Sequence, residues 1–273
     1  MEKAFFSIPD RAGSGTVPPV AMELSFLTYN IHKGIGNDGR FRLERIIDVL
    51  RAANPDFLAL QEVDKGVPRS RGLDLASVIA QELGLEFRLG LNVKLKNGHY
   101  GNSTLTRFPI VRSYNYNVTW GIKKKRGCLN TVCDIGGREI AVMNYHLGLS
   151  AIEQNIQTRK ILKSHFLKTH EDLPVVILGD TNDRMHRLNT LMHKSGFRDT
   201  ARDFNGISEK ERAKVGTTEK IATWPSYAPI GLWRLDKIFY SRQFELVDHD
   251  VIKNANTRVA SDHYPVIAKL RLK

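Results

Sequence analysis

Short apolar runs recur along the whole chain, separated by polar or glycine-containing segments, a pattern typical of β-strands. Two of these runs, Phe57–Leu60 and Val175–Leu178, are apolar at every position, as expected of strands covered on both faces. Further strands are predicted at Leu24–Tyr29, Phe87–Leu91, Ser103–Thr106, Val111–Val118, Leu129–Ile135, Glu139–Tyr145, Leu235–Tyr240, Phe244–Ile252 and Val266–Leu270. The chain is therefore expected to contain many strands and few helices.

Helical spacing of apolar residues appears in three segments between these strands. Leu43–Leu50 has one apolar face, and the helix should end before Pro55 because proline disfavours helix in the residue preceding it. A second helix is predicted over Leu73–Leu83, and the glycine that follows should terminate it. A third begins at the capping-box sequence Ser150–Glu153 and is predicted to run through about Lys168. Together the two patterns predict a mixed α/β protein.

A single domain is predicted over residues 22–273, because neither an internal repeat nor a linker interrupts this stretch. Strands and helices that share one domain are expected to form stacked sheets covered by helices. Residues 1–21 are rich in proline and glycine, so we expect a flexible N-terminal arm. Residues 205–222 are polar and lysine-rich, and we expect a mobile surface loop there.

The charge balance is strongly basic, with 41 Lys and Arg against 29 Asp and Glu, a formal net charge of +12. Such a surplus favours polyanionic partners, which include nucleic acid, phosphorylated metabolites and anionic lipid headgroups, although a basic surface can also serve solubility alone. No apolar stretch reaches the roughly 18 residues of a membrane-spanning helix, and no signal-peptide pattern opens the chain. We therefore expect a monomeric protein located in the cytoplasm.

The chain contains two cysteines, Cys128 and Cys133, which lie in one predicted strand. Their odd separation of five positions sends the side chains to opposite faces of the sheet, so no disulfide is expected between them. We interpret both as small buried side chains in a reducing compartment. The sequence also lacks cysteine-based and histidine-rich zinc spacings, which argues against a structural zinc site.

Polar residues that suit catalysis stand at or beside the ends of six predicted strands, where sheet proteins gather catalytic groups at one edge. Carboxylate oxygens are the ligands that Mg²⁺ prefers, histidine suits proton transfer near neutral pH, and asparagine can hold a phosphate oxygen without adding charge. This set of side chains predicts metal-assisted attack on a phosphate ester. It comprises Asn30 and His32, Gln61 and Glu62, Asn144 and His146, Asp180 and Asn182, Asp236, and Asp262 with His263.

In order and type, these segments resemble the motif series of the endonuclease/exonuclease/phosphatase superfamily, which contains deoxyribonuclease I, exonuclease III, sphingomyelinases and inositol polyphosphate phosphatases. The resemblance extends from about Glu23 to the C-terminus. It implies a four-layer α/β sandwich, in which helices flank two packed mixed β-sheets. It also implies hydrolysis of phosphoester bonds by in-line attack of water, with Mg²⁺ or Mn²⁺ as cofactor.

A closer likeness is to a bacterial subgroup of uncertain substrate. Thr181 departs from the pattern, because many relatives have phenylalanine there, which affects local packing more than chemistry. The segments that carry this closer likeness are Asn30–Gly34, Tyr100–Asn102, Lys125–Gly127, His146–Leu149, Ala222–Ser226 and Arg234–Asp236.

Residue by residue, the resemblance implies that Glu62 is the main metal ligand, with Asn30 and Asp262 nearby. Each also has an ordinary structural interpretation: Glu62 as half of a surface ion pair, Asn30 as a turn residue and Asp262 as a cap before a strand.

The same resemblance implies catalytic roles for five residues. Asp180 and Asn182 are expected to position the attacking water and the phosphoryl oxygens, and Asp236 is expected to orient His263 close to the scissile phosphate. His146 is a candidate general acid or phosphate ligand, although a strand-end histidine is commonly structural. Whether Asp180 or His263 removes the proton from water stays open.

Substrate binding is predicted more weakly, at Lys33, Asn102, Arg126 and Trp224. The basic residues can bind phosphate, or they can belong to a solvated charged loop. The tryptophan can stack on a substrate or pack in the core. Three functions stay open: a nuclease, a phosphatase or phosphodiesterase acting on lipid headgroups or small phosphoesters, and a non-catalytic scaffold. The scaffold is disfavoured because no metal-binding or proton-transfer residue of the series is missing.

Overall fold

The predicted strands form two six-stranded β-sheets in the computed structural model, which describes residues 22–204, 221–228 and 231–273. The first sheet has the order β11-β12-β1-β2-β4-β3, and the second has the order β5-β6-β7-β8-β10-β9. Both sheets are mixed, because β1 pairs with β2 and β7 with β8 in parallel, whereas the other pairings are antiparallel. The strands are β1 (Met22–Asn30), β2 (Phe57–Lys65), β3 (Glu86–Leu95), β4 (Gly98–Thr106), β5 (Ile110–Asn117), β6 (Gly127–Ile135), β7 (Arg138–His146), β8 (Val175–Asp180), β9 (Arg198–Asp199), β10 (Asp236–Tyr240), β11 (Phe244–Val251) and β12 (Val266–Leu272).

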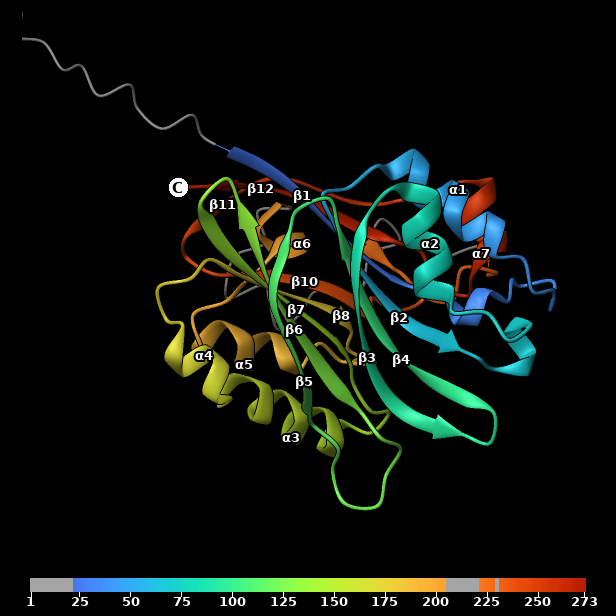
Figure 1. The fold of residues 1–273 in the computed structure, drawn as a ribbon. Helices are drawn as coiled ribbons and strands as arrows, with labels where there is room; N and C mark the ends of the chain where they lie inside the picture. Colours follow the sequence, from blue (N-terminus) through green and yellow to red (C-terminus); the bar gives the residue numbers. More distant parts are fainter. Residues whose placement is uncertain (1–21, 205–220, 229–230) are drawn as a thin grey trace, which may run out of the picture.

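The two sheets pack face to face, and helices cover their outer faces (Figure 1). Helices α1, α2 and α7 lie against the first sheet, and α3, α4 and α5 lie against the second. This arrangement confirms the expected four-layer α/β sandwich. The helices are α1 (Leu43–Ala53), α2 (Leu75–Leu83), α3 (Ala151–Leu162), α4 (His165–Thr169), α5 (Leu188–Lys194), α6 (Thr200–Phe204) and α7 (Ala255–Ala260), with short 3-10 turns η1 (His32–Gly34) and η2 (Pro68–Ser70).

Strand periodicity explains how one strand contributes to two cores. In β1, Phe26 packs into the core between the sheets, whereas Leu27 and Tyr29 pack into the core beneath α1 and α2. Phe26 stacks on Phe57 of the neighbouring β2, with ring centroids 4.8 Å apart. Successive residues of a strand point to opposite faces, so an all-apolar run can serve two cores at once.

The ends of the first two helices follow from the sequence. Asn54 and Gly84, with φ of 42° and 65°, end α1 and α2 in the left-handed conformation. Helix α2 begins at Leu75, two residues later than predicted, because the Asp74 carboxylate accepts a hydrogen bond from the backbone N–H of Ser77 and caps the helix there.

The prediction of one long helix from Ser150 to about Lys168 was wrong. Helix α3 ends at Leu162, and the Ser164 hydroxyl accepts a hydrogen bond from the backbone N–H of Leu167, which begins the separate helix α4. A local cap therefore outweighs the continuing helical pattern. At the start of α3, the Ser150 hydroxyl accepts from the backbone N–H of Glu153, which is one half of the predicted capping box. The Glu153 carboxylate accepts instead from Gln157 Nε2 at 3.0 Å.

The two cysteines are unpaired and buried on opposite faces of β6, as predicted: Cys133 in the core between the sheets and Cys128 in the core beneath α3 and α5. Within the described ranges, no helix is both long and apolar enough to cross a membrane. The predicted arm over residues 1–21 and most of the predicted loop over 205–222 lie outside those ranges. Ile221 and Ala222, at the end of that loop, are buried, which corrects its C-terminal limit.

Candidate functional site

Strand pairing brings three of the predicted catalytic residues together at one edge of the second sheet. Parallel pairing of β7 with β8 places His146 beside Asp180, and antiparallel pairing of β8 with β10 places Asp236 opposite Asp180. The first sheet contributes Asn30 at the end of β1, whose Nδ2 donates to Asp180 Oδ2 at 3.1 Å. The site therefore spans both sheets.

Asp180 lies at the centre of this arrangement and is buried. Its Oδ1 accepts a hydrogen bond from the backbone N–H of Asn182 at 2.9 Å, while its Oδ2 accepts from Asn30. Burial raises the pKa of the carboxyl to about 6, although the nearby His263 acts in the opposite direction. Asp180 is therefore deprotonated at neutral pH, with a proton affinity higher than that of an ordinary aspartate.

His263 is held between two carboxylates. Its Nδ1 lies 2.8 Å from Asp236 Oδ2, and its Nε2 lies 3.8 Å from Asp180 Oδ2. Burial alone would lower the pKa of the imidazole, but Asp236 and Asp180 outweigh it and raise the pKa to about 10. The ring is thus protonated at neutral pH. The loop before β12, which carries His263, is fixed to β1 by the Ser261 hydroxyl, which donates to the Asn30 backbone carbonyl.

His146 lies on the other side of the same aspartate, with its Nε2 3.5 Å from Asp180 Oδ2. Burial, together with the nearby Arg126 guanidinium, lowers the pKa of this imidazole well below its usual range. Its Nδ1 has no hydrogen-bond partner among the described residues. Two histidines of opposite protonation state therefore flank Asp180.

Glu62 occupies a bulge of β2, where the pairing register with β4 shifts between Leu60 and Val63. Its backbone is left-handed, with φ of 59°, an uncommon conformation for glutamate that is often retained at functional sites. The Lys33 ammonium forms an ion pair with its carboxylate. Burial would raise the pKa of Glu62, but His146 and Lys33 lower it well below the usual range.

Asn182 and Asp262 lie on loops beside the site. Asn182, with φ of 52°, donates from Nδ2 to the Leu147 backbone carbonyl at 3.0 Å. Asp262 is partly exposed and accepts a hydrogen bond from Trp224 Nε1 at 3.2 Å. Both residues therefore border the arrangement around Asp180 and keep part of their side chains engaged with the loops.

The residues predicted to bind substrate fall into different settings. Asn102 is buried, and its Nδ2 donates to the backbone carbonyls of Gly127 and Asn144, so it joins the two sheets. Trp224 stacks on Trp233, with ring centroids 5.3 Å apart. Arg126 is buried next to His146, and Lys33 reaches Glu62.

Two buried polar residues beside the site were not predicted to have a role of their own. Gln61 Nε2 donates to Asn144 Oδ1 at 2.9 Å, and Asn144 Nδ2 donates to the backbone carbonyls of Leu60 and Ser103. These bonds join the sheets directly behind Glu62 and His146. Their signal in the sequence was a polar residue inside an otherwise apolar strand, which requires a buried partner.

Two places in the site could bind a divalent metal ion. Atoms of Asp180, Asp236 and His263 lie within 4.8 Å of one another, and His263 Nδ1 is engaged with Asp236. Glu62 also fits, because His146 and Lys33, acting against burial, keep the pKa of its carboxyl well below the usual range, and carboxylate oxygens suit a hard divalent ion. The Lys33 ammonium already places a cation there.

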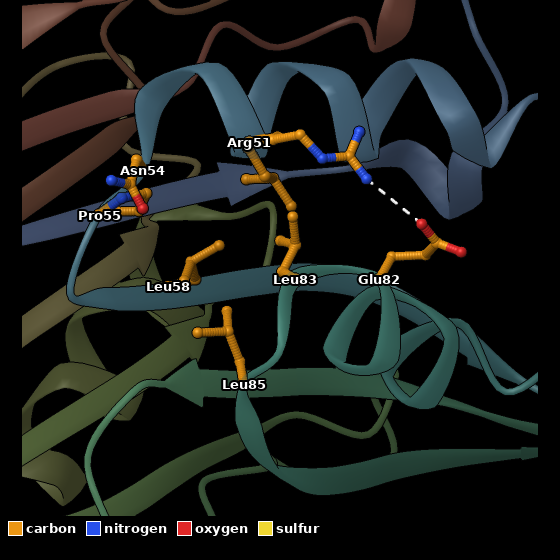
Figure 2. Close-up of a pocket in the computed structure, with 8 residues that line it drawn as sticks. Arg51, Asn54, Pro55, Leu58, Glu82, Leu83 and Leu85 are labelled. Atoms are coloured by element: carbon orange, nitrogen blue, oxygen red, sulfur yellow. Dashed lines mark hydrogen bonds and ion pairs between the residues drawn. The ribbon is translucent and has the colours of Figure 1, made fainter.

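The pocket shown in Figure 2 lies at the other end of β2, next to Leu58, and both leucine and charged side chains line it. Its volume is about 150 Å³, and the ion pair between Arg51 and Glu82 borders it. It contains none of the residues predicted for catalysis or metal binding.

Comparison with known proteins identifies the family. The sequence model of the Endonuclease/Exonuclease/phosphatase family matches residues 27–263. The uncharacterized protein YbhP of Escherichia coli K12 is 29% identical over 269 residues, which cover 94% of this chain and 100% of that protein.

Solved structures show the same fold. An endonuclease/exonuclease/phosphatase from Beutenbergia cavernae has a TM-score of 0.70 at 22% identity, covering 92% of this chain and 72% of that one. The Bacteroides thetaiotaomicron mannosyl-6-phosphatase Bt3783 has a TM-score of 0.68 at 19% identity, covering 90% of this chain and 99% of that one. The chain therefore belongs to the endonuclease/exonuclease/phosphatase family, whose members hydrolyse phosphoester bonds.

Proposed function

We propose that this protein is a divalent-metal-dependent phosphoesterase that activates water at Asp180. The observation that carries the proposal is the buried series Asp236–His263–Asp180, with His146 and Asn30 against the same aspartate. Buried, hydrogen-bonded titratable groups with shifted pKa values are typical of catalytic sites.

The protonation states support a division of the proton-transfer roles. Asp180 is deprotonated at neutral pH with a pKa of about 6, which suits a general base that receives a proton from water. His263 is already protonated, so its Nε2 serves as a hydrogen-bond donor and positive charge for a phosphoryl oxygen. Asp236 orients the ring and stabilises its charge.

The remaining residues are proposed to bind the metal ion and to stabilise negative charge on the phosphoryl group. Mg²⁺ or Mn²⁺, bound by Glu62 with Asn30 and Asp262 nearby, would polarise the phosphoryl oxygen and stabilise the leaving group. His146 and Asn182 stabilise the negative charge that develops on the phosphoryl group.

The substrate class divides into two candidates. A nuclease is favoured by the net charge of +12 and by the stacked Trp224 and Trp233 beside Asp262, since tryptophan can stack on a base. Metal-dependent nicking of plasmid DNA that weakens steeply with salt tests this candidate.

A phosphatase or phosphodiesterase on small or lipid esters is supported by the similar fold of the mannosyl-6-phosphatase. It predicts hydrolysis of bis-p-nitrophenyl phosphate without competition by DNA.

The proposed chemistry is tested by Glu62→Ala, Asp180→Ala and His263→Ala, assayed on a panel of phosphoesters with Mg²⁺ or Mn²⁺. Each substitution is expected to lower kcat/KM by about 100-fold or more, because it removes a metal ligand, a base or a charge-stabilising donor. Glu139→Ala is a matched control that removes an exposed carboxylate paired with Arg112, and it should stay within about 2-fold of wild type. A near-normal rate in Asp180→Ala with metal present contradicts the mechanism.

A further inference from the structure

The most exposed of the large, non-aromatic apolar side chains lie on three segments at one edge of the second sheet. Within the described residues, these side chains are Ile122, Leu149, Ile152 and Met185. Ile122 belongs to the loop between β5 and β6, which projects beyond the strand ends, and it is fully exposed (Figure 1). Leu149 and Ile152 lie where β7 leads into α3, and Met185 lies on the loop after β8. These four side chains are called the apolar rim below.

Strand pairing and side-chain contacts hold the three segments of the apolar rim together. Strand β6 begins at the edge where β7 and β8 end side by side. Helix α3 joins the two outer segments, because Gln154 Nε2 donates to the Asn182 backbone carbonyl at 2.9 Å and Lys160 Nζ donates to the Thr119 backbone carbonyl at 2.7 Å. The rim is therefore part of one surface, which borders the candidate site.

Every exposed charged side chain on these segments is cationic. Residues 118–126, 147–153 and 181–187 contain two carboxylates, and both are buried and occupied. Glu153 accepts a hydrogen bond from Gln157, and Asp183 pairs with Lys237. The exposed charged residues of the three segments are Lys123, Lys124, Lys125, Arg184 and Arg187. The surface around the rim therefore combines apolar groups with positive charge.

Exposed apolar side chains surrounded by cations are typical of protein surfaces that rest on an anionic lipid bilayer. The apolar groups enter the boundary between headgroups and acyl chains, while lysine and arginine are attracted by the negative surface potential. Nucleic acid matches the positive charge of the surface but not its aliphatic groups, because Ile122, Leu149 and Ile152 have no ring to stack on a base. The combination favours a lipid surface.

We propose that the apolar rim and the cationic residues beside it form a docking surface for an anionic lipid bilayer. The rim lies on the segments that follow His146 and Asp180, so docking brings lipid headgroups to the edge of the sheets that carries the site. The substrate is then a phosphoester in the headgroup of a lipid that stays in the bilayer. This substrate class rests on the proposed hydrolase function, whereas the docking surface does not.

The docking surface is tested by flotation of the full chain with lipid vesicles in metal-free buffer. Wild type is expected to bind vesicles of phosphatidylglycerol and phosphatidylcholine at least about 10-fold more tightly than vesicles of phosphatidylcholine alone. Ile122→Ser and Leu149→Ser should each weaken binding to the mixed vesicles at least about 5-fold, because each removes an aliphatic group from the acyl boundary. Val111→Ser is the matched control, since it removes an exposed aliphatic group near the start of β5, and it should stay within about 2-fold of wild type.

The contribution of charge is tested with Lys123→Gln combined with Lys125→Gln. This double variant should bind the mixed vesicles at least about 10-fold more weakly than wild type, whereas Lys163→Gln combined with Lys168→Gln, which makes the same charge change at exposed positions away from the rim, should not. Absence of wild-type binding to mixed vesicles, or equal losses in rim and control variants, overturns the proposal. A loss confined to the lysine variants also overturns it, and indicates a partner such as nucleic acid that is held by charge alone.

The substrate class is tested with phosphatidic acid and phosphatidylglycerol in vesicles and with soluble bis-p-nitrophenyl phosphate, each with Mg²⁺ or Mn²⁺. Wild type is expected to hydrolyse at least one lipid ester. Ile122→Ser should lower kcat/KM on that ester at least about 5-fold and stay within about 2-fold of wild type on the soluble ester, because it weakens only docking. Equal losses on both contradict docking as the cause, and hydrolysis of the soluble ester alone contradicts the lipid class. If no ester is hydrolysed, the proposed function fails, and flotation still decides whether the docking surface exists.

Discussion

His146 and His263 flank the same carboxylate, yet their surroundings drive their pKa values in opposite directions. Both rings are buried, which by itself lowers the pKa of an imidazole. His263 has Asp236 at 2.8 Å to outweigh that cost, whereas His146 has Arg126 nearby, which adds to it. One ring is therefore a fixed cation and the other a neutral imidazole, and their proposed roles follow from this difference.

The raised pKa of His263 makes the stability of the protein depend on pH. The stabilisation from its protonated ring is complete below the unfolded-state pKa of about 6.5 and is lost as pH rises through the folded-state value of about 10. Between pH 7 and 10, wild type should lose up to about 1.4 kcal/mol per pH unit more than Asp236→Asn. Urea unfolding at a series of pH values measures this slope. His263→Asn should flatten it at least as much, because Asp180 still acts on the ring in Asp236→Asn. Parallel curves for wild type and Asp236→Asn would count against the assignment.

At the scale of elements, a buried ion pair holds the connection between β8 and α5. Lys237 of β10 is fully buried and donates from Nζ to Asp183 Oδ2 at 3.1 Å and to Asn189 Oδ1 at 2.9 Å. The same Asp183 oxygen accepts from the backbone N–H of Leu188 at the start of α5. The loop that carries Asn182 into the site is thereby anchored to the sheet.

Breaking this pair on one side should cost more than replacing both partners. Lys237→Met leaves the Asp183 carboxylate buried without its cation, and the free energy of unfolding is expected to fall by about 3–5 kcal/mol. Lys237→Met combined with Asp183→Asn removes both charges and should recover a large part of that loss. Urea unfolding of the single and double variants makes this comparison. A double variant less stable than Lys237→Met would contradict the anchoring role.

At the scale of the whole molecule, the site exists only while the two sheets are packed together. Asn30 and Glu62 come from the first sheet, and His146, Asp180 and Asp236 come from the second. The bond from Asn30 to Asp180 therefore crosses the same interface as the apolar core. A ligand held at this edge is expected to stabilise the packed state of the whole protein.

Metal binding should accordingly raise global stability through Glu62. At a free Mn²⁺ concentration about 100 times its dissociation constant, the free energy of unfolding should rise by about 2.7 kcal/mol in wild type. Glu62→Gln should abolish most of this rise, because a neutral amide is a poor ligand for a hard cation. Thermal unfolding with and without Mn²⁺ measures the effect, and Glu139→Gln serves as the control at an exposed carboxylate. An equal rise in Glu62→Gln would exclude it as the main ligand.

The sequence by itself determined much of the local structure. Periodicity predicted which runs become strands and which faces their side chains take, as Cys128 and Cys133 illustrate. Helix α1 ended before Pro55 and helix α2 ended at the left-handed Gly84, both as expected, because backbone preferences are local. The order of the polar segments also indicated the family, since catalytic groups of a sheet protein follow its strand ends.

Only the tertiary structure decided which polar groups meet and what charge they carry. The break between α3 and α4, the bonds from Gln61 to Asn144 across the sheets and the pairing of Lys33 with Glu62 have no signature in local periodicity. Protonation of His263, and not of His146, depends on burial and on charges contributed by distant segments. Desolvation and long-range contacts exist only in the folded protein, so periodicity and spacing could place these residues at strand ends but could not assign their states.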